Sequence, residues 1–214
     1  MRRAKRLPLE VLAPYLLELP EPRSPLDWRQ IFRDDHPVEL EVGFAKGLFL
    51  LNACQACPNV NFLGIEILRK YQLYAATRFA KRGLKNVRLV KADAREFLRD
   101  YVSDESFQAI HVYFPDPWWK KRHLKRRLFT GDFAAQCERT LQNGGRLYLV
   151  TDVADYFGII TVLLQQHTRL KLLPVSDPKE PTHDLDYLTN FERKFRKEGR
   201  AIYRGVYERV TRVQ

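Results

Sequence analysis

The stretch "VELEVGFAKGLFLLNACQA", residues 38–56, passes from one structural pattern to another. Its first seven residues, "VELEVGF", form a short apolar-rich run, which is typical of a buried β-strand. The run from Leu48 to Ala56 is typical of a helix instead. A strand that leads through a glycine-containing loop into a helix is the repeating unit of an α/β fold.

The same alternation of strand and helix continues along the rest of the chain. Further strands are predicted at residues 59–67, 86–93, 107–114, 143–152 (with a turn at its start) and 201–210. Further helices are predicted at residues 69–83, 94–101, 129–141 and 156–167. Because regular alternation favours parallel pairing with helices on both faces, we expect a doubly wound, mostly parallel sheet.

The length of 214 residues suits one domain with a short extra segment at one end. Residues 1–37 are basic and proline-spaced, and we expect them to form an N-terminal arm or cap that is poorly ordered at its start. Residues 38–214 would then form the main domain.

The net charge of +11 and the isoelectric point near 9.7 indicate a polyanionic partner, most often a nucleic acid. The alternative is a solvated basic surface on an enzyme that binds no polyanion.

Two features argue against secretion and against insertion in a membrane. The apolar core that a signal peptide needs is interrupted here by Pro8, Glu10, Pro14 and Glu18. The longest uncharged run, residues 47–65, is broken by a proline and three asparagines and is not expected to span a bilayer.

The chain has three cysteines, an odd number that favours a reducing compartment and hence a cytoplasmic location. Cys54 and Cys57 form a CxxC pair, but no second pair follows and Cys137 lies far away. Packing on a helix is the simpler interpretation, and we expect no metal site.

The loop after the first strand carries the pattern E-x-G-x-A-x-G from Glu41 to Gly47. A dinucleotide fingerprint would need glycine at positions 43, 45 and 48, where the chain has Gly43, Ala45 and Leu48. The pattern is closer to the acidic, glycine-rich loop of S-adenosylmethionine-dependent methyltransferases. Glu41 suits the ammonium and sulfonium of that cofactor, whereas it would repel a pyrophosphate, and Gly43 lets the backbone approach the ligand.

Two more acids follow the next strands. Glu66 closes the second strand, where an acid can accept both ribose hydroxyls, and Asp93 after the third strand is placed to mark the adenine edge. Each acid also has a structural interpretation: Glu41 as an incidental polar residue, Glu66 as a charge at a helix start and Asp93 as a helix cap. Three acids at three successive strand ends favour the cofactor site.

Residues 113–128, "YFPDPWWKKRHLKRRL", resemble the signature of the bacterial tRNA (guanine-N7)-methyltransferases, which is close to PDPWPKKRHxKRR. Thr151-Asp152 and "TNFERK" at Thr189–Lys194 resemble two later motifs of that family, in the same order. The resemblance runs from about Val38 to Val210.

The resemblance implies a class I, Rossmann-like methyltransferase that moves a methyl group from S-adenosylmethionine to N7 of a guanine in tRNA. The family's target is position 46 of the variable loop. It also implies an enzyme without an obligatory protein partner, as a monomer or a homodimer. By matched position, the cofactor would contact Glu41, Gly43, Glu66, Asp93 and Asp116. Asp116 would also be the catalytic residue.

The same matching assigns residues to the RNA substrate. The target nucleotide would be held by Lys120, Asp152, Thr189, Asn190, Phe191 and Glu192. The RNA would run along Arg122, His123, Leu124, Lys125, Arg126 and Arg127. Residues 120–127 contain six lysines or arginines, so phosphate contact is favoured over a merely solvated helix start.

Three positions depart from the family pattern. Ala45 replaces the middle glycine of the loop, Trp119 replaces a proline, and Asn190 replaces a lysine. The first bears on the loop's geometry, the second adds a stacking surface, and the third removes a charge near the substrate.

The chemistry of guanine N7 is consistent with these residues. N7 carries a free lone pair and no proton, so its methylation needs positioning and charge stabilisation and no general base. A carboxylate such as Asp116, held between two prolines, can orient the base and offset the charge that appears on it. Trp118 and Trp119 offer stacking surfaces, although core packing could occupy one of them.

Acceptors such as Asp152 and Glu192 would select guanine through its N1–H and its amine. Both have a structural alternative, since Asp152 could cap a helix and Thr189-x-x-Glu192 is a capping box. Two other functions stay open: an amino-group methyltransferase, because "DPW" faintly resembles the loop of adenine-N6 enzymes, and a non-catalytic RNA-binding protein on the same fold.

Overall fold

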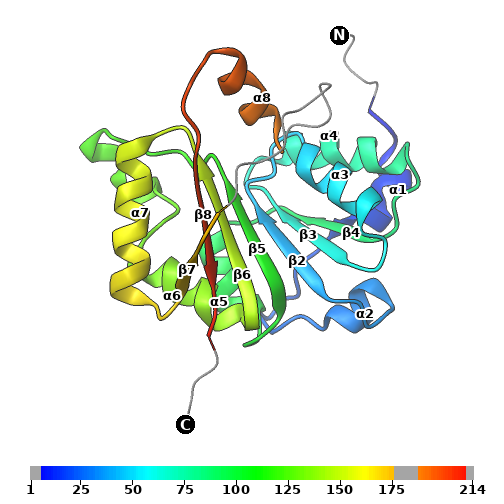
Figure 1. Cartoon of the computed structure of the whole chain (residues 1–214). Coiled ribbons are helices and arrows are strands. Elements are labelled where there is room, and N and C mark those ends of the chain that lie inside the picture. The colour runs from blue at the N-terminus through cyan, green and yellow to red at the C-terminus, as the bar shows by residue number, and fades with distance from the viewer. Residues whose placement is uncertain (1–5, 176–187, 211–214) are drawn as a thin grey trace.

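The computed structural model describes residues 6–175 and 188–210 and contains one mixed sheet (Figure 1). Within these residues the strand order is β1-β4-β3-β2-β5-β6-β8-β7. The strands are β1 (Leu16–Leu17), β2 (Val38–Val42), β3 (Asn61–Ile65), β4 (Val87–Val90), β5 (Phe107–Tyr113), β6 (Leu141–Thr151), β7 (Lys171–Leu173) and β8 (Tyr203–Glu208). The first six strands pair in parallel, and β8 runs antiparallel to both β6 and β7. The predicted mostly parallel sheet is confirmed.

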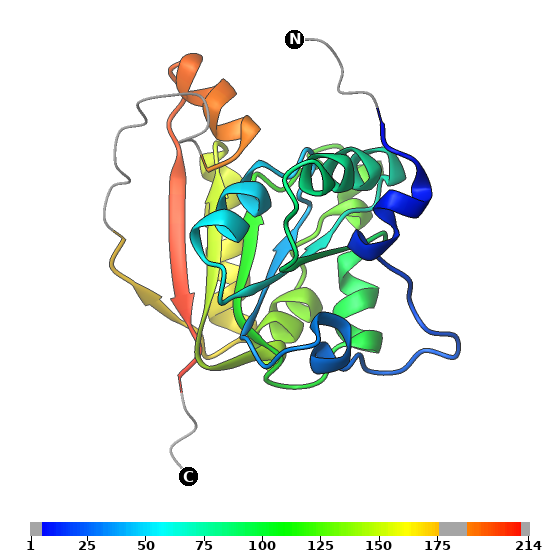
Figure 2. The same cartoon turned by 90° about the vertical axis from the view of Figure 1, so that its right-hand side faces the viewer.

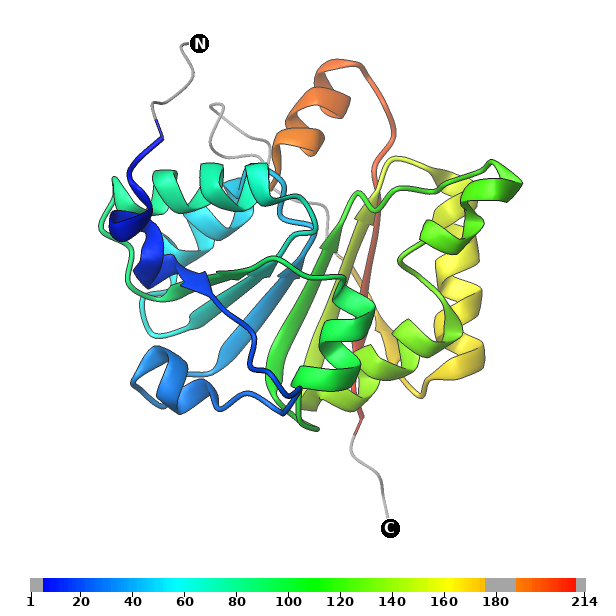
Figure 3. The ribbon, with the colours of Figure 1, turned by 180° about the vertical axis from the view of Figure 1, so that it is seen from behind.

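Helices cover both faces of the sheet, as a doubly wound fold requires (Figures 1 and 3). The helical elements are α1 (Leu9–Leu12), η1 (Ala13–Tyr15), α2 (Trp28–Phe32), α3 (Leu48–Ala56), α4 (Arg69–Ala80), α5 (Ala94–Tyr101), η2 (Lys121–Arg126), α6 (Gly131–Thr140), α7 (Ala154–His167) and α8 (Asn190–Lys197). Helices α3 and α4 bury one cluster against β3 and β4, whereas α5, α6 and α7 bury a larger cluster on the opposite face.

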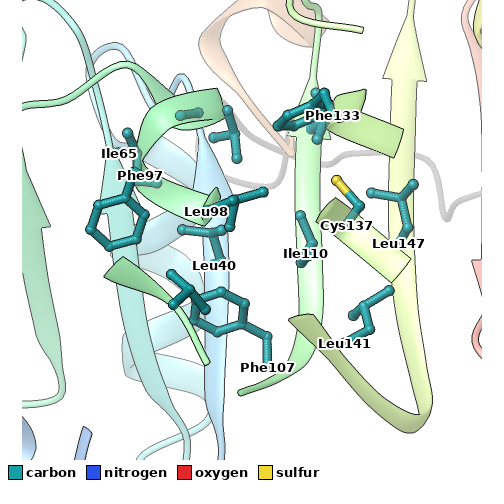
Figure 4. Packing of buried hydrophobic residues seen from close by; sticks show 14 of the residues in the cluster. Leu40, Ile65, Phe97, Leu98, Phe107, Ile110, Phe133, Cys137, Leu141 and Leu147 are labelled. Atoms are coloured by element: carbon teal, nitrogen blue, oxygen red, sulfur yellow. The ribbon is translucent and has the colours of Figure 1, made fainter. Parts of the chain in front are cut away.

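The larger cluster joins the centre of the sheet to the helices α5 and α6 on one of its faces (Figure 4). Phe133 and Cys137 of α6 are fully buried there, and so are the flanking Phe129 and Leu141. These four residues, each four positions after the last, therefore form a buried stripe, but the helix is shorter than the predicted 129–141. Thr130 starts it by accepting a hydrogen bond from Phe133 N at 3.1 Å, and Leu141 is already extended.

The turn expected at the start of the fifth predicted strand is wrong. Residues 143–145 lie inside the long strand β6, as an irregularity in its pairing with β5. Phe107 pairs with Leu141, but Ala109 pairs with Arg146, so the extra residues bulge out of the ladder.

The N-terminal residues that the structure describes pack onto the domain. Leu16–Leu17 adds an edge strand beside β4, and Leu12 and Phe32 are buried. The predicted boundary at residue 37 stays a prediction, and the expected disordered start, residues 1–5, lies outside the described residues. None of the described helices combines the length and the apolar content needed to cross a bilayer.

Gly64 of β3 lies where side chains are closely packed below the loop that follows β2. A Cβ there would lie 2.6 Å from Phe44 Cδ1, 2.7 Å from Leu50 Cδ1 and 2.8 Å from Leu89 Cδ2. Gly64→Ala should therefore lower the free energy of unfolding by about 1–3 kcal/mol through overpacking. Gly158, inside α7 with open space around it, is the matched control, and Gly158→Ala should raise the free energy of unfolding by about 0.5–1 kcal/mol. Urea unfolding measures both, and equal effects of the two substitutions would contradict this packing.

Candidate functional site

The five acids expected at the strand ends lie at one edge of the sheet. Because β2 to β6 are parallel, their carboxyl ends share that edge, which α8 overlies (Figures 1 and 2). Glu41 lies in β2, Glu66 and Asp93 follow β3 and β4, and Asp116 and Asp152 follow β5 and β6. The chain turns in opposite directions from β2, towards β3 on one side and β5 on the other, and ligands of such sheets bind at that switch point.

A cavity of about 340 Å³ opens at this switch point. Its walls come mainly from the segment around the loop after β2 and from the start of α8, with one residue each from α4 and β5. Its lining consists of Glu41, Gly43, Phe44, Ala45, Lys46, Leu48, Phe49, Tyr71, Tyr113, Thr189, Asn190, Phe191, Arg193 and Lys194.

Glu41 gives this cavity its chemical character. The residue is 3% exposed, and its Oε2 atom has no hydrogen-bond partner. Burial first, and then the nearby charge of Glu66, raise the pKa of Glu41 to about 8, while the backbone N–H of Leu50 offsets part of the rise. A buried acceptor without a donor suits a ligand that brings a cationic N–H group. The ammonium of S-adenosylmethionine is such a group, so the residues present fit this cofactor.

The loop after β2 has three left-handed residues, Gly43 (φ 77°), Ala45 (φ 46°) and Gly47 (φ 63°). The left-handed region costs alanine about 1–2 kcal/mol, yet Ala45 keeps the conformation that a glycine would take. Glu66 stabilises it, because its carboxylate accepts Ala45 N–H at 3.1 Å and Leu68 N–H at 3.0 Å. At the position of the family's middle glycine, Ala45 thus adopts a left-handed conformation with its N–H bound to Glu66.

Asp93 caps α5, as its structural interpretation predicted. It accepts Arg95 N–H at 2.9 Å and pairs with the Arg95 guanidinium at 2.7 Å, and that side-chain hydrogen bond is the main reason why the pKa of Asp93 is lowered. Arg95 Nη1 also donates to Lys125 O at 3.1 Å, which ties α5 to η2. A contact of Asp93 with adenine stays a prediction.

Asp116 lies in a loop of unusual backbone conformation. The preceding Phe114 and the following Trp118 both have left-handed φ angles, 54° and 43°. The Asp116 side chain is exposed, yet neighbouring groups displace part of its solvent and raise its pKa. Asp116 does not line the cavity, and its contact with the cofactor stays a prediction.

The basic segment after this loop forms η2. Lys120, Arg122, Leu124, Lys125 and Arg126 are exposed, and His123 and Arg127 are half-buried. Trp118 lies edge-on to His123, and the Arg126 guanidinium lies 5.3 Å from the Trp118 ring centroid. Trp119 is 49% exposed and contacts Tyr156. Neither tryptophan is fully buried, and base stacking stays a prediction.

Three of the expected substrate residues reach the cavity: Thr189, Asn190 and Phe191. Phe191 is 44% exposed, and Asn190 lies where the family has lysine. The neighbouring Arg193 and Lys194 also line the cavity, so positive charge is retained on this wall without that lysine.

Glu192 does not line the cavity. It is 3% exposed, its Oε2 atom accepts Leu188 N–H at 2.9 Å, and its Oε1 atom accepts from Arg196 at 3.0 Å and from Arg204. Thr189 accepts Glu192 N–H at 3.0 Å, so the capping interaction is present. Asp152 accepts Arg200 Nη1 at 2.5 Å. Both carboxylates therefore have protein partners in this structure. Recognition of guanine by Glu192 or Asp152 stays a prediction.

The sequence analysis missed Tyr113 and Phe49, which line the cavity. The Tyr113 hydroxyl shares a hydrogen bond of 2.7 Å with His111 Nδ1, and His111 Nε2 lies 2.9 Å from Glu39 Oε2. Burial, followed by the charge of Glu41, raises the pKa of Tyr113 far above its usual range. The position of Tyr113 at the end of β5 was the sequence signal that could have indicated a residue lining the cavity. An apolar strand end is equally typical of a residue in the hydrophobic core.

Comparison with known proteins connects this geometry to a family. The family model described as "Putative methyltransferase" matches residues 35–205. The tRNA (guanine-N(7)-)-methyltransferase of Rhodopirellula baltica is 42% identical over 185 residues, 84% of this chain and 68% of that protein. The protein of the same name from Geobacillus kaustophilus is 34% identical over 87% of this chain and 86% of its own.

A solved structure adds evidence on the fold. A variant of the 16S rRNA (adenine(1408)-N(1))-methyltransferase of Catenulisporales acidiphilia, crystallised with its cosubstrate SAM, superposes with a TM-score of 0.59 at 14% identity. The match covers 89% of this chain and 95% of that one. The architecture is that of the Rossmann-like S-adenosylmethionine-dependent methyltransferases, as the sequence predicted.

The Glu41 carboxyl predicts how cofactor binding depends on pH. Its pKa of about 8 keeps it mostly protonated at neutral pH, and an incoming ammonium favours the carboxylate, so binding should release a proton. The affinity for S-adenosylmethionine should rise by up to about tenfold per pH unit as pH approaches 8, and then level off. Calorimetric titration in two buffers of different ionisation enthalpy measures the released proton. Glu41→Gln should bind more weakly with a flat profile, and a flat profile in the unmodified protein would contradict the assignment.

Proposed function

This chain belongs to the tRNA (guanine-N(7)-)-methyltransferase family, and we propose that it methylates the guanine at position 46 in the variable loop of tRNA. The reaction transfers a methyl group from S-adenosylmethionine to N7 of guanine. The observation that supports this most directly is the order of features along one sheet edge: a cavity for a cationic cofactor, the Asp116 loop and an exposed basic segment.

The residues of this chain have to position two reactants and offset a charge. When bound, the cofactor supplies a methyl group on a positively charged sulfur. The N7 lone pair forms the new bond while the bond from the methyl carbon to sulfur breaks, and the positive charge moves to the guanine. No proton leaves N7, so no general base is needed. Correct alignment alone contributes up to about 7–11 kcal/mol in favourable cases.

Glu41 would hold the cofactor through its ammonium, and Asp116 would face the guanine. The Asp116 carboxylate is partly desolvated, which raises its pKa and strengthens its interaction with a neighbouring cation. A group of this kind stabilises the charge that develops on the base during transfer.

The exposed side chains of η2 would contact the phosphate backbone of the tRNA. Lys121, Arg122, Lys125 and Arg126 are all exposed within one short element next to the Asp116 loop. A cluster of exposed cations binds a polyanion by releasing its counterions, which makes the affinity salt-dependent. With tRNA as its substrate, we place the enzyme in the cytoplasm, active as a monomer or a homodimer and without an obligatory protein partner.

Incubation of unmodified tRNA with labelled S-adenosylmethionine, followed by nucleoside analysis, tests the product and its position. A tRNA with 7-deazaguanosine at position 46 should bind with nearly normal affinity but accept no methyl group there, because the lone pair is gone and the Watson–Crick edge is intact. An amino-group methyltransferase would still modify the deaza nucleoside, and an RNA-binding protein without activity would modify neither RNA. Methyl transfer to the deaza nucleoside would sink the N7 assignment.

Asp116→Asn should lower the turnover number by about 10²-fold or more, because it removes the negative charge and keeps the side-chain shape. Steady-state kinetics at saturating tRNA and cofactor measure the effect, and circular dichroism verifies that the variant is folded. Turnover near that of the unmodified enzyme would exclude a catalytic role for Asp116.

A further inference from the structure

Arg127 lies at the end of the basic segment, but its side chain points into the protein. Its Nε atom donates a hydrogen bond to Pro117 O at 2.6 Å. The guanidinium lies 5.1 Å from the ring centroid of Trp119 and 5.6 Å from that of Tyr156. Arg126, its neighbour in sequence, is exposed and lies over Trp118. The two arginines therefore occupy different environments, although the sequence presents them as a pair.

The carbonyl that Arg127 binds belongs to the residue directly after Asp116. The loop around Asp116 turns at Phe114 and at Trp118, both of which have left-handed φ angles. Non-glycine residues persist in this conformation only where their surroundings hold them. At the first turn, Phe114 N–H donates to Val150 O at 2.7 Å and fixes the loop to β6. At the second turn, the corresponding anchor is the Arg127 hydrogen bond to Pro117.

Tyr156 lies beneath this second anchor. It is fully buried near the start of α7, directly after the β6 end that carries Asp152. Burial is the main reason for its raised pKa, and the charges of Arg127 and Asp116 act on it in opposite directions. Trp119, Arg127 and Tyr156 thus form one contact group that connects the Asp116 loop to α7.

We propose that Arg127 is a positioning residue, which holds the loop of residues 114–118 in the conformation that presents Asp116 to the target guanine. In this role Arg127 is not one of the phosphate contacts that the family resemblance implied for it. The inference rests on the proposed function for its effect on methylation, but the anchoring of the loop does not depend on the substrate.

An arginine is required here for geometric reasons. The planar guanidinium can face the Trp119 and Tyr156 rings while Nε donates to the carbonyl, and a lysine has no donor at the Nε position. A phosphate contact has no such requirement, because a lysine retains the charge. Arg127→Lys therefore separates the two roles.

The experiment compares Arg127→Lys and Arg127→Met with Arg126→Met. Single-turnover methylation at saturating tRNA and cofactor should fall about tenfold or more in both Arg127 variants, because a small displacement of a reacting group has a large effect on rate. The tRNA dissociation constant and its salt dependence should stay close to those of the unmodified enzyme. Arg126→Met should differ in binding, with weaker tRNA binding and a salt slope reduced by up to about 0.9 for a lost duplex contact.

Hydrogen exchange measured without RNA tests the anchor directly. The amide of Phe114, which donates to Val150 O at 2.7 Å at the other end of the loop, should exchange faster in the Arg127 variants than in the unmodified protein. Unchanged exchange in both Arg127 variants would overturn the proposal. So would full recovery of rate and tRNA affinity in Arg127→Lys. Faster exchange in an enzyme that methylates no tRNA would support the anchor and refute the proposed function instead.

Discussion

The parallel pairing of β2 with both β3 and β5 fixes the position of the whole site. Glu41 lies opposite Gly64 on one side and His111 on the other. Because Gly64 has no side chain, Phe44 and Leu50 can lie close to β3 and bring the loop after β2 down over the strand end. This close packing explains how the Glu41 carboxylate is buried beside an open cavity. The ends of the other parallel strands are positioned relative to β2 by their pairing in the sheet.

Charged side chains fall into two zones along the catalytic edge, which is the sheet edge that contains the carboxyl ends of β2 to β6. The inner zone has the buried acid Glu41, whose Oε2 atom has no hydrogen-bond partner, and the outer zone has the exposed cations of η2. A cationic small molecule and a polyanion are therefore attracted to different places, although both have to meet at one point. Asp116 precedes η2 in the chain and follows β5, whose end reaches the same sheet edge as Glu41.

Local rules predicted the order of the elements because hydrophobic periodicity is a local property, and the shared edge of the acids because regular alternation of strands and helices favours parallel pairing. They did not predict the direction of individual side chains. Arg126 and Arg127 look equivalent in the sequence, but Arg126, at the end of η2, is exposed, whereas Arg127, the next residue, donates a hydrogen bond to Pro117 O. Glu192 looked free to read a base, yet Arg204 of the later strand β8 binds it. Such partners come from tertiary packing, which the pattern of one segment does not contain.

The antiparallel insertion of β8 between β6 and β7 sets the order in which the cavity can be completed. A strand that runs against its neighbour starts at the catalytic edge, so α8, directly before β8, has to lie over that edge. Synthesis proceeds from the N-terminus, and domains form as their residues emerge. The wall that contains Glu41 and Tyr113 is therefore synthesised before Thr189 and Phe191, which follow later in the chain. A nascent chain consequently has one wall of the cavity first, and the enclosed form arises only after α8 has emerged.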